Sequence, residues 1–310
     1  MATRTDPGAR QIGFLRERYG SAAQTTLPRQ GEWSAAYSVR TADADLVVRF
    51  SRYDEDFEKD AYAARYSSTA LPIPAIIEWG PALDGFYAVA QRVSGQPLDG
   101  LDEMWMRRVL PSLFAALAAM RTADLSDAAG FGGWRASGRA ESPSWREWLL
   151  GIAERPATRG APGWRELLKD SSTGVGPYER GYARMRELVD LCPEERHLVH
   201  DDLINFNVLV DGDRISAVLD WGSSIYGDFL YDIAKLAFYQ PWYPAWRNID
   251  FAAEARGYYD AVGLEVPHFL ERLTCYMLRI GIGDMAYSAF RKRWEQVESK
   301  ARRTLEIANT

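Results

Sequence analysis

The sequence predicts an α+β protein of two lobes, with a small β-rich N-terminal lobe that contains one main helix and a larger, mostly helical C-terminal lobe. Three observations lead to this fold class. Residues 25–92 are dominated by β-branched and aromatic runs, interrupted by one helical stretch over 56–68. Helical periodicity prevails from about residue 95 onward. Within that helical part, segment 197–232 contains two apolar runs joined by turn residues, which predicts a β-hairpin.

Elsewhere in the chain the periodicity predicts a series of helices and short strands, without internal repeats. Gly- and Pro-rich composition predicts mobile surface loops over 124–144 and 155–177. Strands are expected at 37–39, 46–50, 75–79 and 86–92, and helices at 9–20, 56–68, 102–122, 143–152, 164–170, 178–191, 228–239, 251–262 and, in two or more pieces, 268–307.

Composition narrows the class of protein. With 310 residues and 47% hydrophobic content, the chain can bury a substantial core. A net charge of -6 argues against nucleic acid or an anionic membrane as partner. The two cysteines, Cys192 and Cys275, suit a reducing compartment and form no disulfide framework. The start of the chain lacks an apolar signal core and no apolar run reaches membrane-spanning length, so we expect a cytoplasmic protein, a monomer or weak dimer.

The hairpin segment carries the strongest functional pattern. His200, Asp202 and Asn207 have the spacing H-x-D-x-x-x-x-N, and Asp220 begins a D-W-G triplet after the second apolar run. Folding back at Asp211–Arg214 brings Asn207 and Asp220 to one open end, with Asp202 one loop earlier. Oxygen-bearing side chains in this arrangement can hold Mg²⁺ and orient an attacking hydroxyl, which is what phosphoryl transfer requires.

Simpler explanations of the same residues remain open. Asp202 and Asn207 could cap a loop, and Asp220 could be a turn residue at a strand end. For His200, a hydrogen bond that structures the loop is favoured over a role as general base, because the carboxylate of Asp202 already fills that role.

In the small lobe, Arg49 is the most informative residue. Alternation along the strand puts Arg49 on the face opposite Val48, where it would look toward a nucleotide cleft. Asp60, on the following helix, can pair with Arg49, and the guanidinium can bind phosphate. A solvated surface pair is the alternative.

Two further stretches could contact a nucleotide. The loop Gly31–Ala36 could present backbone N–H groups and the Ser34 hydroxyl to phosphate oxygens, although an ordinary hairpin turn is equally consistent. A strand that ends before Gly95 could pair adenine with backbone groups from Gln91 to Val93.

Several segments together carry a family resemblance over about residues 25 to 285. They are FEKDAYAARY, ALPIPAIIEWG, ADLSDAAGFG, HLVHDDLINFNVLV, DRISAVLDWGSSIYGD and YMLRIG. They resemble the aminoglycoside phosphotransferase family of small-molecule kinases. The resemblance implies a protein-kinase-like fold, with a nucleotide-binding lobe and hinge over 1–93 and a catalytic and substrate-binding lobe over 94–310.

The resemblance also implies roles for particular residues. Asp202 would be the catalytic carboxylate, Asn207 and Asp220 would ligate Mg²⁺, and Arg49 with Asp60 would bind phosphate. Asp228 and Asp232 are similar to a family G-D-x-x-x-D element in which an Asp braces the catalytic loop. An N-cap is a compatible alternative for Asp228.

For substrate binding, an acidic and aromatic pocket is expected. A polycationic aminoglycoside needs carboxylates, and flanking prolines make two aromatic residues hard to bury by helical periodicity. The candidates are Asp201, Asp202, Asp228, Asp232, Trp242 and Tyr243.

The resulting functional expectation is transfer of phosphate from ATP, with GTP not excluded and Mg²⁺ required, to a hydroxyl of an aminoglycoside such as hygromycin B. A macrolide, an amino alcohol or a sugar is the alternative acceptor. A nucleotide-binding protein without catalysis would require the loss of a metal ligand, and none is lost.

Overall fold

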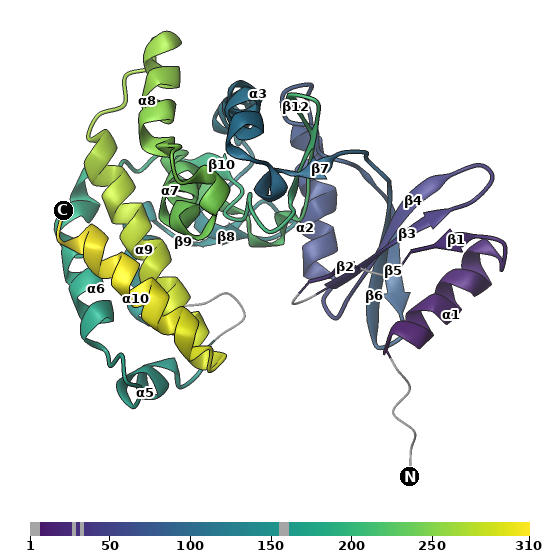
Figure 1. Ribbon diagram of the computed structural model, residues 1–310, viewed down its shortest axis with the longest axis horizontal. Helices are drawn as coiled ribbons and strands as arrows, with labels where there is room; N and C mark the ends of the chain where they lie inside the picture. The colour runs from purple at the N-terminus through teal and green to yellow at the C-terminus, as the bar shows by residue number, and fades with distance from the viewer. Residues whose placement is uncertain (1–6, 27–28, 32–33, 155–160) are drawn as a thin grey trace.

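The computed structural model describes residues 7–26, 29–31, 34–154 and 161–310. Its N-terminal part is one antiparallel sheet with the strand order β1-β3-β4-β6-β5, and β2 pairs with β3. Helix α1 lies against this sheet, and α2 lies between the sheet and the C-terminal part of the chain (Figure 1). The elements are α1 (Pro7–Tyr19), β1 (Gln24–Thr25), β2 (Arg29–Gln30), β3 (Ser34–Arg40), β4 (Asp45–Ser51), α2 (Glu55–Ala63), β5 (Ile76–Ala82) and β6 (Gly85–Gln91).

Alternation along the central strands explains the small core of this sheet. Val48 and Phe50 on β4 are buried and pack with Tyr37 of β3 and Leu15 of α1. Arg49 points to the opposite face because successive side chains of a strand alternate. The predicted two-sided pattern of β4 is therefore confirmed.

A short linker joins the two parts of the chain. Strand β6 ends at Gln91, and β7 (Gln96–Pro97) already pairs with β11 (Val208–Asp211) of the C-terminal part. Gly95 lies between them with φ of +148°, and a Cβ there would approach Ser216 Oγ to 2.7 Å. The division between residues 93 and 94 falls within this linker and stays a prediction.

The C-terminal part is mostly helical, as predicted, with α9 packed between α6, α7 and α10 (Figure 1). One large apolar core runs through it. Its elements are α3 (Glu103–Arg121), β8 (Phe131–Trp134), β9 (Ala140–Ser142), α4 (Trp145–Leu150), α5 (Trp164–Lys169), α6 (Gly176–Leu188), β10 (His197–Val199), β11 (Val208–Asp211), β12 (Arg214–Val218), β13 (Ile225–Gly227), α7 (Leu230–Tyr239), α8 (Phe251–Ala261), α9 (Phe269–Phe290) and α10 (Trp294–Ala308).

One prediction for this part was wrong. Segment 124–144 was expected to be a mobile loop, but it contains β8 and β9, which join β10 and β13 in a sheet ordered β10-β13-β8-β9. Burial of Phe131 and Trp134 under the helices holds β8 in place. Of the second predicted loop, residues 155–160 lie outside the described residues, and α5 begins at Trp164.

The predicted β-hairpin is confirmed. β11 and β12 pair in antiparallel register from Val208 opposite Val218 to Asp211 opposite Arg214. Gly212 turns the chain with φ of +61°, a conformation that glycine adopts at low cost. On the described residues, no helix is long and apolar enough to cross a membrane.

Candidate active site

The open end of the β11–β12 hairpin brings Asn207 and Asp220 together. The backbone N–H of Leu219 donates to the carbonyl of Asn207 at 2.7 Å, so Asp220 follows directly beside it. Asp220 has φ of +61°, and Asp201, Asn205 and Phe206 in the preceding loop also have positive φ. Such backbone conformations are costly for non-glycine residues and gather at functional sites.

Asp202 lies against Asn207 in this loop. The side-chain amide of Asn207 donates to Asp202 Oδ2 at 2.9 Å and to the Asp202 carbonyl at 2.8 Å. Asn205 Nδ2 donates to Oδ1 at 2.8 Å. Burial raises the pKa of Asp202 to about 6, and the nearby Lys235 ammonium opposes that rise. A carboxyl group with this pKa is mostly ionised at neutral pH and can accept a proton.

Two buried groups hold the loop that carries Asp202. Both carboxylate oxygens of Asp232 accept backbone bonds, from the N–H of His200 at 2.9 Å and from that of Asp201 at 2.8 Å. His200 is fully buried, and burial lowers its pKa to about 4. Its neutral ring accepts from the Asp202 N–H at Nδ1, so Nε2–H donates to the Leu219 carbonyl at 2.9 Å. These contacts fix the loop against β12.

Arg49 connects the N-terminal sheet to the hairpin. Its guanidinium donates to Asp60 Oδ2 at 2.5 Å and to Asp220 Oδ1 at 3.3 Å. The other oxygen of Asp60 accepts from the backbone N–H of Trp221 at 2.7 Å. Burial raises the pKa of Asp60 to about 6, and Arg49 acts against the rise. The predicted Arg49–Asp60 pair is present, and it is partly buried rather than a solvated surface pair.

Helix α2 also contributes a residue that the sequence patterns did not single out. Lys59 is buried, and its ammonium donates to the carbonyls of Gly222 and Ser224, each at 2.8 Å. Lys59 and Asp60 therefore hold the turn after Asp220 from the same helix. The position of Lys59 directly before the predicted Asp60 was the signal in the sequence that could have identified it.

The other nucleotide-binding candidates lie at the edges of the N-terminal sheet. Ser34 begins β3, opposite Ser51 of β4, and its carbonyl accepts from the Gly31 N–H at 2.9 Å. The middle of the predicted phosphate loop, 32–33, lies outside the described residues. Gln91 ends β6 opposite Leu46, and Val93 follows in the linker. Their contacts with a nucleotide stay predictions.

The oxygen donors at the hairpin suit a Mg²⁺ ion. Since Nδ2 of Asn207 is committed to Asp202, Oδ1 is the atom that can ligate a cation. The carboxylate of Asp220 is 41% exposed and supplies the second donor. Mg²⁺ prefers such hard oxygens and completes its shell with water and phosphate. Over the described ranges, no group of three or more His, Cys, Asp or Glu side chains could hold a metal, so a mixed Asn and Asp set is the one that the site offers.

Apart from Asp202, three of the substrate-binding candidates are at least partly exposed, namely Asp201, Trp242 and Tyr243, and two are buried, namely Asp228 and Asp232. Asp201 forms an ion pair with Lys235 at 2.7 Å, and both side chains are about one-fifth exposed, at 20% and 19%. Tyr243 stacks on Trp246, and burial together with the charges of Asp99 and Asp202 raises its pKa to about 12.

Trp242 is 36% exposed and bonds to α10 through Ser299 Oγ, 2.8 Å from its indole nitrogen. It forms part of an aromatic wall with Phe238 and Tyr239.

The expectation that Asp228 binds substrate is corrected. Its side chain is 0% exposed and forms a bidentate ion pair with Arg272, with two N–O distances of 2.8 Å. Tyr276 also donates to it, and the N–H of Leu230 donates at 3.1 Å near the start of α7. A carboxylate enclosed in this way has no open side for a ligand. Asp232 is 2% exposed and bonded to the loop, so it too is removed from the substrate-binding set.

The sequence patterns did not single out Lys235 or Lys300, which lie close to Asp201 and Asp284 respectively. In the structure Tyr239 of α7 donates to Asp284 of α9, and Lys300 of α10 lies 4.0 Å from the same carboxylate. Lys235 stands three residues after Asp232, on the same face of α7, and that spacing could have identified it. Asp284 and Lys300 come from separate helices and left no local signal.

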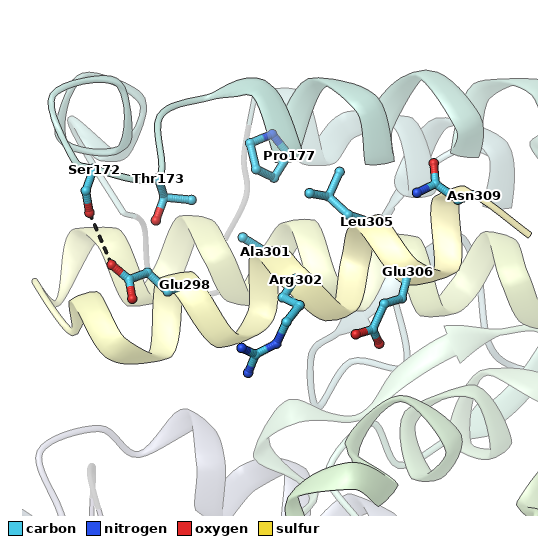
Figure 2. Close-up of a pocket in the computed structure, with 9 residues that line it drawn as sticks. All are labelled: Ser172, Thr173, Pro177, Glu298, Ala301, Arg302, Leu305, Glu306 and Asn309. Carbon is cyan, nitrogen blue, oxygen red and sulfur yellow. Dashed lines mark hydrogen bonds between the residues drawn. The ribbon is translucent and has the colours of Figure 1, made fainter.

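A surface groove lies elsewhere, away from the hairpin. It has a volume of about 500 Å³ and runs along α10 beside the start of α6. Figure 2 shows Ser172 bonded to Glu298 across it, at 3.2 Å. None of the predicted site residues lines this groove.

A small antiparallel sheet joined to a helical lobe, with charged groups of both meeting at a hairpin end, defines a kinase-like phosphotransferase fold. Residues 25–269 match the family model described as the phosphotransferase enzyme family. The chain therefore belongs to this family.

Particular relatives agree with that assignment. The chain is 31% identical over 277 residues to the hygromycin-B 4-O-kinase of Escherichia coli, covering 89% of this chain and 77% of the relative. The crystal structure of aminoglycoside phosphotransferase APH(4)-Ia is 28% identical, covers 97% of this chain and 98% of its own, and gives a TM-score of 0.83. A thermostable mutant of APH(4)-Ia in a ternary complex with AMP-PNP and hygromycin B gives a TM-score of 0.82 at 28% identity, over 96% of this chain and 97% of the other. The predicted kinase-like fold and family are confirmed.

Proposed function

We propose that this protein transfers the γ-phosphoryl group of ATP to a hydroxyl of an aminoglycoside of the hygromycin B type, with Mg²⁺ as cofactor. The observation that carries the proposal is the convergence of Asp202, Asn207 and Asp220 at one end of the hairpin, facing Arg49. The relatives support it, since one is named hygromycin-B 4-O-kinase and another was crystallised with AMP-PNP and hygromycin B.

In this proposal the N-terminal lobe holds the nucleotide. Arg49 offers its guanidinium to the phosphates while Asp60 keeps it in place, and Ser34 with its loop covers the phosphates. Backbone groups from Gln91 to Val93 pair with the base. Asn207 and Asp220 would hold Mg²⁺, which supplies positive charge that neutralises the phosphates during transfer.

Asp202 acts on the acceptor. Its carboxylate orients the attacking hydroxyl and accepts the proton as the O–H bond breaks. The hydroxyl oxygen forms a new bond to phosphorus, and the bond to the leaving oxygen of ADP breaks with its electron pair. The hydrogen bonds from Asn205 and Asn207 fix the carboxylate for this step, so little reorganisation is needed.

Asp201, Tyr243 and Trp242 form the acceptor side in this proposal. One observation favours a less charged acceptor, such as an amino alcohol, a sugar or a macrolide, as the alternative: Lys235 neutralises Asp201, which reduces the negative charge offered to a polycation. We further propose that the chain works in the cytoplasm, where ATP is available, as a monomer or weak dimer.

A panel assay tests the proposed activity. The purified protein is incubated with ATP, Mg²⁺ and single acceptors that include hygromycin B, a macrolide, choline and glucose, and ADP release and acceptor phosphate are measured. We expect hygromycin B to give a kcat/KM at least about tenfold above the other acceptors. Binding of Mg²⁺–ATP without phosphate transfer to any acceptor would replace this proposal with a nucleotide-binding protein.

A further inference from the structure

A ring of aromatic residues beside the acceptor side encloses the ammonium of Lys300. Its Nζ lies 3.5 Å from the centroid of Trp242, 4.0 Å from that of Tyr239 and 5.6 Å from that of Phe238. We call these three side chains the aromatic cage. The faces of aromatic rings attract cations, most strongly when the cation is shielded from water.

Lys300 is partly buried, and its ammonium has few polar contacts within the protein. Its side chain is 11% exposed, and the carboxylate of Asp284 is 4.0 Å away, beyond hydrogen-bond distance. Across the part of the chain that the structure describes, no acceptor is hydrogen-bonded to Nζ. An ammonium has three donors, and withdrawing them partly from water without protein acceptors costs free energy. Burial accordingly lowers the pKa of Lys300 to about 8, with Asp284 opposing the change.

The aromatic cage adjoins the loop that carries Asp202. Tyr239 donates to Asp284, and the charges of Asp202 and Asp201 help to raise the pKa of its hydroxyl, after burial and Asp284. Lys235, one turn earlier on α7, pairs with Asp201. Trp242, one wall of the cage, is 36% exposed and is therefore partly in contact with solvent. A ligand group can therefore reach the cage from the acceptor side.

We propose that the aromatic cage and Asp284 form a subsite for an ammonium group of the acceptor, and that Lys300 is its internal occupant, which the acceptor displaces. The inference rests on the proposed function for the place of the acceptor. Its ligand class is a primary alkylammonium, matched by the four-carbon stem and ammonium of Lys300 itself.

Displacement has a clear physical consequence. Lys300 regains water at its three donors when it leaves the cage, while the acceptor ammonium takes over the ring faces and Asp284. The site is ready for ligand only in the fraction of molecules in which Lys300 has left, and the apparent affinity falls by that fraction. Lys300 is therefore a specificity-determining residue, since it penalises acceptors that gain little from the cage.

The test uses Lys300→Ala, which leaves the cage vacant, and n-butylammonium as the probe. Binding is followed by tryptophan fluorescence and melting temperature, with 1-butanol as the neutral isostere. We expect Lys300→Ala to bind n-butylammonium at least about tenfold more tightly than the wild type, and 1-butanol without any gain. Equal affinity of the two proteins for n-butylammonium would overturn the inference. Lys169→Ala, an exposed site on α5, is the matched control for loss of one charge and should behave as the wild type.

A second variant covers the case in which Lys300→Ala does not fold. Trp242→Leu removes the nearest ring, and we expect the KM for hygromycin B to rise about fivefold with kcat and the KM for ATP unchanged. An unchanged KM for hygromycin B would contradict the cage as a subsite.

The two proposals fail separately. Phosphorylation of hygromycin B by the wild type, with no gain of n-butylammonium binding in Lys300→Ala, removes only the cage. Binding of n-butylammonium to Lys300→Ala, by a protein that phosphorylates no member of the panel, removes only the proposed function.

Discussion

The two sides of Asp202 hold their charges differently. On the side of Arg49, which we call the phosphate side, Arg49 bonds directly to Asp60 at 2.5 Å and Lys59 donates two bonds of 2.8 Å. On the acceptor side, Lys235 bonds to Asp201 at 2.7 Å, but the ammonium of Lys300 lies 4.0 Å from the carboxylate of Asp284. A buried charge with direct partners is fixed, whereas one without them can be exchanged. The phosphate side is therefore rigid, whereas the acceptor side is able to adapt to its ligand.

The connections of the two sides differ as well. The phosphate side joins α2 to the turn after Asp220, so it ties the two lobes together. The acceptor side, with Asp201, Trp242 and Tyr243, adjoins contacts between α7, α9 and α10 and lies within one lobe. Changes on the phosphate side should therefore alter the response to nucleotide, and changes on the acceptor side should alter the response to the acceptor. Four predictions test this division.

The largest effect is expected at Asp202, where both sides meet. Asp202→Ala should lower kcat by about a hundredfold or more, because the hydroxyl loses its proton acceptor, with nucleotide binding largely kept. Steady-state kinetics and nucleotide titration calorimetry measure the two effects. Asp211→Ala, exposed on the hairpin, is the control. Near-normal turnover of Asp202→Ala would discard this assignment.

On the phosphate side, Asp60→Asn keeps the shape of the side chain and removes its charge. Arg49 then loses its closest partner, and hydrogen bonds to charged groups contribute about 1.5–3 kcal/mol. We expect the KM for ATP to rise about tenfold and the KM for the acceptor to stay within about twofold. Kinetics with each substrate varied in turn measure the difference, and Glu55→Gln on the exposed part of α2 is the control. A larger change in the acceptor KM than in the ATP KM would reverse the division.

On the acceptor side, Lys235→Met should give the opposite selectivity. The variant leaves Asp201 without its cation at a position that is about one-fifth exposed. Solvent screens part of that loss, so we expect the acceptor KM to change by about threefold and the ATP KM to remain as it was. The same two-substrate kinetics apply, with Lys169→Met as the control. An effect on ATP alone would place Lys235 on the phosphate side.

The smallest effect concerns ligand removal. Saturating ATP should raise the melting temperature by about 5 °C when Mg²⁺ is present, since ligand at about a hundred times Kd stabilises the folded state by about 2.7 kcal/mol. With EDTA the increase in melting temperature should largely vanish. Without the cation, the carboxylate of Asp220 repels the phosphates, and the neutral amide of Asn207 does not attract them. A melting temperature that rises equally in both conditions would argue against these two residues as metal ligands.

Local pattern was a good guide on the phosphate side. The hairpin followed from two apolar runs and a Gly turn, and the inward face of Arg49 followed from strand alternation. Both depend on neighbours in the chain. Strands β8 and β9 were missed because Gly-rich sequence has weak strand preference. Their stabilisation comes from the pairing of β8 with β13, about ninety residues later in the chain, and β9 then pairs with β8.

Buried acids were the hardest residues to place. Asp228 looked like a pocket residue, yet its partner Arg272, on helix α9, encloses it. The position of Asp232 in the sequence agreed with a residue that holds the loop, and it does accept two backbone bonds from the loop. Its burial could not be predicted, because an acidic side chain is usually exposed. Whether an acid faces water or a guanidinium is decided by packing, which a local pattern does not contain.

The sequence by itself determined the family, the hairpin and the set of oxygen donors at its open end, because each rests on short spacing and strand periodicity. Only the tertiary structure decided which charges pair across helices, that Asp228 is enclosed, and that Lys300 enters an aromatic cage. The physical reason is that these contacts join side chains from separate helices, and their free energy depends on burial that arises only when the helices pack.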